Sequence, residues 1–251
     1  MGRIIAVVNQ KGGVGKTTTA VNLAAALTEA GKRVLLCDFD PQANASSGMG
    51  VDKRKLKHSV YDVIIDDVPV YDVIVSTRFG DVLPSSADLA GAAVELLSME
   101  NPNFRLRSAL QLVQDQYDMV LIDCPPSLEL LTVNALAAAD GILVPVQCEY
   151  FALEGLADLM NTLRLVKKRI NPALEIFGVL LTMFDGRTNF STQVAQEVRK
   201  HFPGKAFATV IPRNVRLAEA PSHGLPVTAY DKSSRGAKAY QAVTLEIIKR
   251  L

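Results

Sequence analysis

A loop rich in glycine and lysine near the start of the chain limits the possible fold more than any other feature. It reads Lys11-Gly12-Gly13-Val14-Gly15-Lys16-Thr17-Thr18. An apolar run at 4–8 precedes it and a helical pattern follows it, which is the order of a phosphate-binding loop at a helix N-terminus. In such a loop backbone N–H groups point inward, Lys16 reaches the β- and γ-phosphates, and the Thr17 hydroxyl binds Mg²⁺. The sequence therefore predicts a protein that binds a nucleoside triphosphate.

The loop departs from the usual GxxxxGK pattern at its first position. The first glycine of that pattern would fall at Gln10, and the next residue is a second lysine, Lys11. This extra cation indicates a distinct subclass of phosphate-binding loops. A glycine-rich turn with incidental lysines is the alternative interpretation, and the order of strand, loop and helix argues against it.

Apolar runs alternate with helical patterns along the rest of the chain. Strands are expected at 4–8, 34–37, 119–122, 142–146, 176–183 and 209–211. Helices are expected at 17–30, 87–97, 105–116, 128–139, 156–170, 190–201 and 237–250. This alternation predicts a doubly wound, mostly parallel α/β sheet with helices on both faces, in a single domain over 1–251. The segment 51–79 is harder to interpret, and we expect helix and surface loop there.

Acidic residues follow two of the expected strands, at the sheet edge where ligands of such folds gather. Asp38 and Asp40 follow the run 34–37, so Asp38 can hold the magnesium shell through water and Asp40 can orient the attacking water. Asp123 ends the run 119–122, as the Mg²⁺-binding Walker B carboxylate does. The alternatives are an acidic turn that caps a helix at 38–40 and an ordinary strand-terminal acid at 123.

The composition excludes some classes of protein and leaves others open. The net charge is +1, which by itself indicates neither a nucleic acid nor a membrane partner. Residues 187–251 nevertheless hold 11 Lys and Arg against 4 Asp and Glu, while 1–186 hold 16 against 22. This basic end is either a solvated face or a binding surface for a polyanion.

The cysteines and the hydropathy pattern indicate a reduced, cytosolic and soluble protein. Cys37, Cys124 and Cys148 lack metal-ligand spacing, and no apolar signal segment precedes the first strand. No apolar run reaches the ~18 residues that a bilayer-spanning helix needs.

Together these motifs resemble the deviant Walker A ATPases, and within them the ParA/Soj partition ATPases, a group that also contains MinD and the nitrogenase iron protein. The resemblance covers essentially the whole chain. Besides the loop 11–18 it rests on Asp38-Phe39-Asp40-Pro41-Gln42, Ile122-Asp123-Cys124-Pro125-Pro126-Ser127, Pro145-Val146-Gln147-Cys148-Glu149 and Ile211-Pro212-Arg213-Asn214-Val215-Arg216-Leu217-Ala218-Glu219-Ala220-Pro221-Ser222.

The resemblance implies that the chain is a Mg²⁺-dependent ATPase that binds ATP and ADP. In such proteins the early lysine, here Lys11, crosses to the partner's nucleotide, so that ATP joins two subunits in a sandwich homodimer. It also implies that Met183, Pro212 and Asn214 lie around the adenine.

Two features indicate the branch of the family: the position at which the loop begins and the basic end of the chain. The loop starts ten residues from the amino end, so we expect no N-terminal helix-turn-helix domain, as in the short, chromosomal type. By resemblance, such a dimer binds double-stranded DNA without sequence preference, associates with the nucleoid and is stimulated by a ParB/Spo0J-type protein during chromosome or plasmid partition. Arg187 and Arg216 match basic positions implicated in the family, and weaker candidates are Arg213, Lys232, Arg235 and Lys249. For any single arginine the alternative is an ordinary surface charge, and Arg216 could serve dimer contacts instead.

Two other members of the group remain as alternative interpretations. The first is a membrane-cycling regulator like MinD, because one face of the last helix carries apolar residues: Tyr240, Val243, Ile247 and Leu251. Helical stripes of this kind more often pack on a core, and Asp40-Pro41-Gln42 favours the partition branch, so we expect no membrane partner. The second is an iron-sulfur reductase like the nitrogenase iron protein, against which small-residue packing explains the cysteines.

Overall fold

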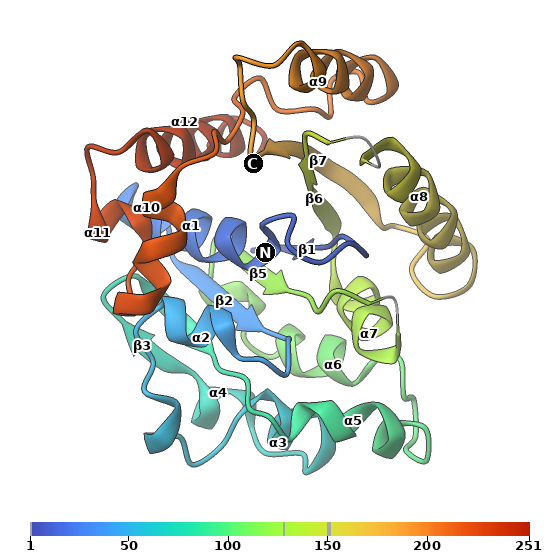
Figure 1. The fold of residues 1–251 in the computed structure, drawn as a ribbon. Helices are drawn as coiled ribbons and strands as arrows, with labels where there is room; N and C mark the ends of the chain where they lie inside the picture. The colour runs from blue at the N-terminus through green and yellow to red at the C-terminus, as the bar shows by residue number, and fades with distance from the viewer. Residues whose placement is uncertain (1, 128, 150–151) are drawn as a thin grey trace.

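The computed structural model describes residues 2–127, 129–149 and 152–251, which form a central sheet with helices on both faces (Figure 1). Within this described part the strands form one sheet in the order β3-β4-β2-β5-β1-β6-β7. Neighbouring strands run parallel except β3 and β4. The predicted doubly wound, mostly parallel sheet is confirmed. The strands are β1 (Arg3–Val7), β2 (Val34–Asp38), β3 (Val75–Thr77), β4 (Gly80–Leu83), β5 (Met119–Asp123), β6 (Gly141–Gln147) and β7 (Glu175–Thr182).

The helices of the described residues connect these strands and cover the sheet. They are α1 (Lys16–Glu29), α2 (Asn44–Gly48), α3 (Val60–Ile65), α4 (Val70–Val73), α5 (Leu89–Leu96), α6 (Arg105–Gln111), α7 (Leu130–Ala138), α8 (Ala152–Arg169), α9 (Asn189–His201), α10 (Val215–Glu219), α11 (Val227–Tyr230) and α12 (Arg235–Ile248). Short 3₁₀ turns lie at Lys53–Lys55, Gln114–Gln116 and Ala220–His223. The predicted helix 128–139 begins at Leu130 in the structure, and its first residue lies outside the described residues.

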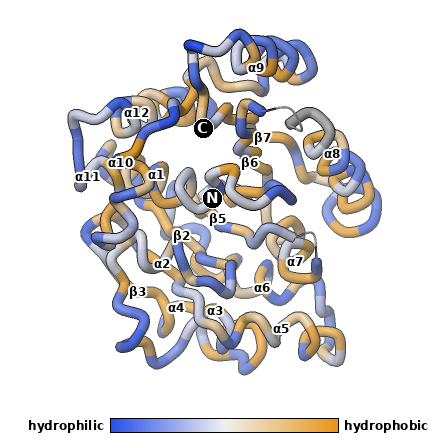
Figure 2. Tube along the Cα trace, viewed as in Figure 1, coloured by the Kyte–Doolittle hydropathy of each residue, from blue (hydrophilic) through white to orange (hydrophobic). Residues whose placement is uncertain are grey.

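Side-chain alternation along the strands divides the core into two layers. On β1, Ile4 and Ala6 face the layer packed by α3 to α9, whereas Ile5 and Val7 face the layer packed by α1 and α12. The apolar runs of the central strands are therefore buried on both faces, as parallel sheets require. The outer helices α8 and α9 alternate hydrophobic and hydrophilic residues, because only one side of each meets the core (Figure 2).

The register of the parallel strands brings their carboxyl ends to one edge. Val7 of β1 and Asp38 of β2 both align with Asp123 of β5. The loop that follows β1, the turn that follows β2 and the end of β5 therefore meet at the same edge of the sheet.

The segment 51–79 contributes to the sheet, which its sequence did not predict. It contains α3, α4 and β3, and β3 pairs antiparallel with β4 through Ser76 and Asp81. Strand β3 has three residues, none of them buried. An edge strand this short carries no apolar run, so its pattern could not be distinguished from a loop.

The expected strand at 209–211 is wrong. Ile211 does bond to the edge of β7, but the N–H groups of Ala208 and Thr209 donate to the Glu246 carboxylate of α12, at 2.9 and 2.8 Å. A side chain thus takes the place of a strand partner, and only isolated bridges form.

The predicted helix 105–116 is interrupted. Helix α6 ends at Gln111 and a separate 3₁₀ turn follows at Gln114–Gln116. The side chain of Gln114 explains part of this, because it turns inward to donate to the carbonyl of Gly2 at 2.5 Å.

Candidate functional site

The loop 11–18 joins β1 to the first turn of α1, as the sequence predicts (Figure 1). Gly13 (φ 76°) and Gly15 (φ 91°) adopt left-handed backbone conformations that other residues rarely take. Gly15 is the N-cap of α1, so the unpaired N–H groups of the first turn, which contains Thr17 and Thr18, border the loop. At Gly12 the space beside the backbone is open. These features suit the binding of phosphate groups.

Two buried polar side chains fix this loop to neighbouring strands. The amide of Asn9 donates to the carbonyl of Pro145 in β6 at 2.7 Å and accepts the N–H of Lys11 at 3.0 Å. The hydroxyl of Thr182, at the end of β7, donates to the carbonyl of Val14 at 2.8 Å. Sequence reasoning missed both residues. The sequence offered one signal for Thr182, which is a polar residue that follows the apolar residues 179–181.

The two lysines of the loop both have partners within the chain. Lys16 is buried and its ammonium donates to the carbonyl of Lys11 at 3.2 Å. Burial lowers the pKa of Lys16, and nearby carboxylates such as Asp123 oppose this effect. The partly exposed ammonium of Lys11 forms an ion pair with Glu149, just beyond β6. The structure thus places Lys16 inside the site and Lys11 at its rim.

Asp38 and Asp123 end adjacent strands, and both are fully buried. Asp38 has both oxygens occupied: Oδ1 accepts the N–H of Asp40 at 3.3 Å, and Oδ2 accepts the N–H and hydroxyl of Ser46 at 2.6 and 2.7 Å. Burial raises the pKa of Asp38 to about 6, although the bonds from Ser46 act in the opposite direction.

Asp123 differs because neither of its buried oxygens has a hydrogen-bond partner in the described part of the chain. Burial and the neighbouring Asp38 raise the pKa of Asp123 well above its ordinary value, while the nearby Thr17 hydroxyl acts in the opposite direction. An unpartnered, buried carboxylate of this kind calls for a cation.

These residues fit a magnesium ion bound together with phosphate. Mg²⁺ keeps several waters and is held by one or two carboxylates plus phosphate oxygens, so Asp123 and the hydroxyl of Thr17 are sufficient protein ligands. No cluster of three or more His, Cys, Asp or Glu side chains suited to a metal occurs among the described residues, and such an ion requires none. Asp38, already engaged by Ser46, is left to act through water, and that role stays a prediction.

Asp40 lies in a tight turn just beyond β2 and is 9% exposed. Its Oδ1 accepts the N–H of Gln42 at 3.0 Å, and its carbonyl accepts the N–H of Ala43 at 2.9 Å. Its Oδ2 has no partner within the described ranges, so this oxygen is available to orient a water molecule.

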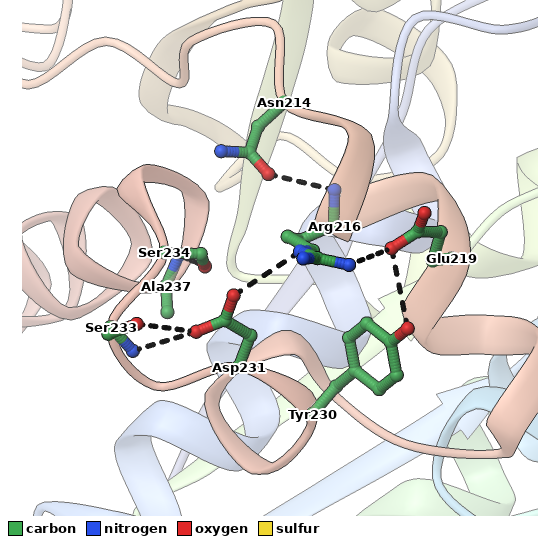
Figure 3. A network of polar contacts seen from close by, with 8 residues as sticks. All are labelled: Asn214, Arg216, Glu219, Tyr230, Asp231, Ser233, Ser234 and Ala237. Carbon is green, nitrogen blue, oxygen red and sulfur yellow. Dashed lines mark hydrogen bonds and ion pairs between the residues drawn. The ribbon is translucent and has the colours of Figure 1, made fainter.

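The segments expected around the adenine meet at the end of β7. Met183 has a φ of 50°, a left-handed conformation that is rare for a residue with a side chain. The next residue, Phe184, forms an isolated bridge with Pro212. Asn214 caps α10, where its Oδ1 accepts the N–H of Arg216 at 2.9 Å, and its NH₂ group has no partner in the part of the chain that is described (Figure 3). The structure therefore places the segment of Met183 and Phe184 beside the segment that holds Pro212 and Asn214.

Arg187, one of the two predicted DNA-binding arginines, lies beyond β7 in a bidentate pair with Asp185. The distances are 2.9 Å from Nε and 2.6 Å from Nη2. Hydrogen bonds from Arg187, together with the nearby charge of Arg213, hold the pKa of Asp185 well below its usual range. The backbone N–H of Arg213 donates to the carbonyl of Phe184 at 3.2 Å, so the chain at Arg213 passes next to the segment that holds Asp185.

Arg216, the other predicted arginine, lies between two carboxylates (Figure 3). Its Nη1 is 2.7 Å from Glu219 and its Nε is 3.3 Å from Asp231. The hydroxyl of Tyr230 donates to Glu219 at 3.3 Å, and Ser233 donates to Asp231. The guanidinium is still about half exposed.

The weaker basic candidates are exposed. Lys232 pairs with Glu29 at 3.2 Å, Arg235 begins α12, and Lys249 follows its last turn.

The apolar stripe of the last helix is used in the core. Tyr240, Val243 and Ile247 are each at most 1% exposed and belong to the layer that contains α1, whereas Leu251 is 48% exposed. This face is therefore unavailable to a lipid surface. None of the described helices combines the length and apolar character needed to cross a membrane.

The three cysteines are buried and unpaired. Burial raises the pKa of the Cys37 and Cys124 thiols well above the ordinary value, and raises that of Cys148 to about 11. Because iron-sulfur clusters bind thiolates, this environment opposes the reductase interpretation.

Comparison with known proteins places this geometry in a family. The family model described as "AAA domain" matches residues 2–176. The chain is 56% identical to the sporulation initiation inhibitor protein Soj of Bacillus subtilis, over 98% of both chains. It is 51% identical to the chromosome partitioning protein ParA of Myxococcus xanthus, over 100% of this chain and 89% of that protein.

Solved structures agree with the fold. Cobyrinic acid a,c-diamide synthase of Mycobacterium smegmatis, with bound ADP and magnesium, is 39% identical with a TM-score of 0.86, over 99% of this chain and 95% of that one. The cell division ATPase MinD of Pyrococcus furiosus is 32% identical with a TM-score of 0.83, over 100% of both chains.

Proposed function

Because the chain belongs to the Soj/ParA family of chromosome-partitioning ATPases, we propose that it is an ATP-dependent dimerising switch that acts in partition. The switch binds Mg²⁺-ATP, dimerises, holds DNA without sequence preference, and is reset by slow hydrolysis. The same proposal includes three further points. A ParB/Spo0J-type protein stimulates hydrolysis, the protein acts at the nucleoid, and residues 1–251 form a single ATPase domain.

One observation carries the nucleotide part of this proposal. The carboxylate of Asp123 is buried, with no hydrogen-bond partner among the described residues, at the sheet edge where the loop 11–18 begins α1. Magnesium supplies charge neutralisation for phosphate when it is bound there, and Asp123 with the Thr17 hydroxyl would hold it. Lys16 and the N–H groups of the first turn of α1 bind the phosphates. Magnesium and ADP in the related structure support this assignment.

Dimerisation depends on Lys11 in this proposal. The Lys11 side chain lies at the rim and is 40% exposed, so its ammonium can reach a second subunit once it leaves Glu149. There it would meet the partner's triphosphate, which gives the ATP form a subunit contact that the ADP form lacks.

Retention on DNA depends on the basic surface at the end of the chain. The candidates Arg187 and Arg216 are both exposed, and dimerisation doubles their number. Each phosphate contact releases counterions, so affinity falls as salt rises.

Hydrolysis depends on Asp40, whose Oδ2 has no hydrogen-bond partner among the residues that the structure describes and would orient the attacking water. Loss of the γ-phosphate removes the contact for Lys11, and the dimer separates from DNA.

The proposal is tested by size-exclusion chromatography with light scattering on wild type and Asp40→Ala, with ADP or ATP and Mg²⁺. Both proteins should be monomeric with ADP. With ATP, Asp40→Ala should remain a stable dimer that co-elutes with nonspecific duplex DNA at low salt and is released at high salt.

Asp72→Ala, the same change at an exposed acid of α4, is the matched control and should behave as wild type. A molar mass that is the same with ADP and with ATP would contradict the proposal. ATP-dependent sedimentation with anionic vesicles in place of DNA would favour the MinD-like alternative instead.

A further inference from the structure

We propose that Ser46 is a positioning residue for ATP hydrolysis, which holds Asp38 and, through it, the turn that carries Asp40. This inference rests on the proposed function, because it assigns Ser46 to the same hydrolytic step. Ser46 itself is fully buried and acts only through Asp38.

The contacts of Ser46 leave its side chain a single orientation. Its hydroxyl oxygen accepts the N–H of Ser85, just beyond β4, at 3.1 Å. With that acceptor direction used, the hydroxyl donates to Oδ2 of Asp38 at 2.7 Å, beside the Ser46 N–H at 2.6 Å. Two donors thus converge on one carboxylate oxygen, and hydrogen bonds to a charged group are among the stronger ones in proteins.

Asp38 passes this restraint to the turn of Asp40. Its other oxygen accepts the Asp40 N–H at 3.3 Å. The chain leaves β2 at Asp38, passes through Asp40 and returns at Ser46 to the same carboxylate. The turn is therefore a closed loop with both ends fixed on Asp38.

The turn requires this restraint because part of its backbone is strained. Ala43 has a φ of 51°, in the left-handed region that residues with a Cβ avoid. Such a conformation persists only where surrounding contacts hold it. The Ser46 bonds lie three residues after Ala43 and provide that support, which fixes where the Oδ2 of Asp40 lies.

The test compares Ser46→Ala and Ser46→Cys with wild type for kcat of ATP hydrolysis at saturating ATP and duplex DNA. Removing a hydroxyl donor from a charged acceptor should lower kcat about tenfold in Ser46→Ala. Ser46→Cys, which keeps a weak donor, should give an intermediate kcat. The ATP concentration at half-maximal dimerisation should change less than about twofold in both variants, because the hydrogen bonds of the Ser46 side chain go to Asp38 and Ser85 and not to the phosphate loop.

Ser98→Ala is the matched control. It removes a hydroxyl just beyond α5, which donates to the carbonyl of Glu95 at 2.8 Å and lies outside the turn 38–46. Its kcat should stay near wild type.

An unchanged kcat in Ser46→Ala overturns the inference, as does a parallel loss of kcat and of ATP-dependent dimerisation, which a merely structural role would cause. If Ser46→Ala does not fold, Ser46→Cys decides, and wild-type kcat in that variant counts against the inference. A wild-type protein that neither dimerises with ATP nor hydrolyses it contradicts the proposed function instead.

Discussion

The ammonium of Lys11 forms an ion pair with the carboxylate of Glu149 in the same chain. The two residues lie at the ends of different strand-loop units, β1 and β6, and both are partly exposed. In the proposed mechanism Lys11 meets the triphosphate of a second subunit, so this pair must open first. Glu149 therefore competes with the partner's nucleotide for the same cation.

We expect Glu149→Gln to dimerise at a lower ATP concentration than wild type. The substitution keeps the size of the side chain and removes the charge that holds Lys11. Because a partly exposed ion pair is worth about 0.2–1 kcal/mol, the half-maximal ATP concentration should fall by a factor of about 1.4 to 5. Light scattering across an ATP titration measures it.

Lys11→Ala serves as the opposite reference, since it should bind ATP and remain monomeric. Glu175→Gln removes a carboxylate at the other end of the sheet and should leave the titration unchanged. An unchanged or higher midpoint in Glu149→Gln would show that Glu149 does not restrain Lys11.

The position of Arg216 between Glu219 and Asp231 predicts how it contributes to DNA binding. We expect Arg216→Ala to reduce the slope of log Kobs against log salt by about two, because each subunit of the dimer loses one phosphate contact. Glu219→Gln should act in the other direction and raise DNA affinity, because it removes a negative charge 2.7 Å from the guanidinium. Fluorescence anisotropy with labelled duplex DNA over a salt series measures both.

Arg164→Ala is the control for this prediction. Arg164 lies on α8, where its Nη1 donates to Asn161 at 2.8 Å, outside the predicted DNA-binding set. If it lowers the salt slope as much as Arg216→Ala does, the assigned surface is wrong. Dimerisation with ATP should be normal in all three variants.

The fold could be predicted where burial on both faces leaves a continuous apolar run. That holds for β1, β5 and β6, whose central residues are buried throughout. It fails for β3, a short edge strand with exposed residues, and for 209–211, where Glu246 takes the place of a strand partner. Both failures depend on contacts between residues far apart in the chain, which a local pattern does not contain.

The candidate site divides in the same way. The loop 11–18 and Asp123 were found because each has a local signal, a glycine spacing or an acid that ends a strand. Ser46 has no such signal, and Asn9 has only its place after the apolar run 4–8. Their partners Asp38 and Pro145 are identified only by the folded structure. Their polar character in an otherwise apolar core becomes informative only once burial is known.

The buried hydroxyl of Tyr240 links the last helix to the helix that follows the phosphate loop. It lies 3.1 Å from the hydroxyl of Thr19, and both residues are at most 1% exposed. Tyr240→Phe leaves the Thr19 hydroxyl without this partner, so the free energy of unfolding should fall by about 1 kcal/mol. Urea denaturation followed by circular dichroism measures the change. Tyr71→Phe, at a tyrosine that is 63% exposed, should lie within about 0.5 kcal/mol of wild type.

Glu246 of α12 predicts how stability responds to acid. Burial raises its pKa, but hydrogen bonds from Thr209 and Ala208 outweigh burial and hold the pKa below its ordinary value of 4.5. A carboxyl whose pKa is depressed by folding binds fewer protons in the folded chain than in the unfolded one. Its stabilising effect is therefore complete above about pH 4.5 and is lost as the pH falls through the folded pKa.

We expect Glu246→Gln to be less stable than wild type at pH 7. As the pH falls from 6 to below about 4.5, the variant should lose less of its free energy of unfolding than wild type does. The amide cannot be protonated there, and it accepts the two backbone N–H groups less strongly than a carboxylate does. Urea denaturation at a series of pH values measures the difference between the two proteins, which should narrow as the pH falls below about 4.5. Glu100→Gln, at an exposed residue, should run parallel to wild type over the same range. A constant difference between Glu246→Gln and wild type at every pH would mean that the two bonds do not depend on the charge of Glu246.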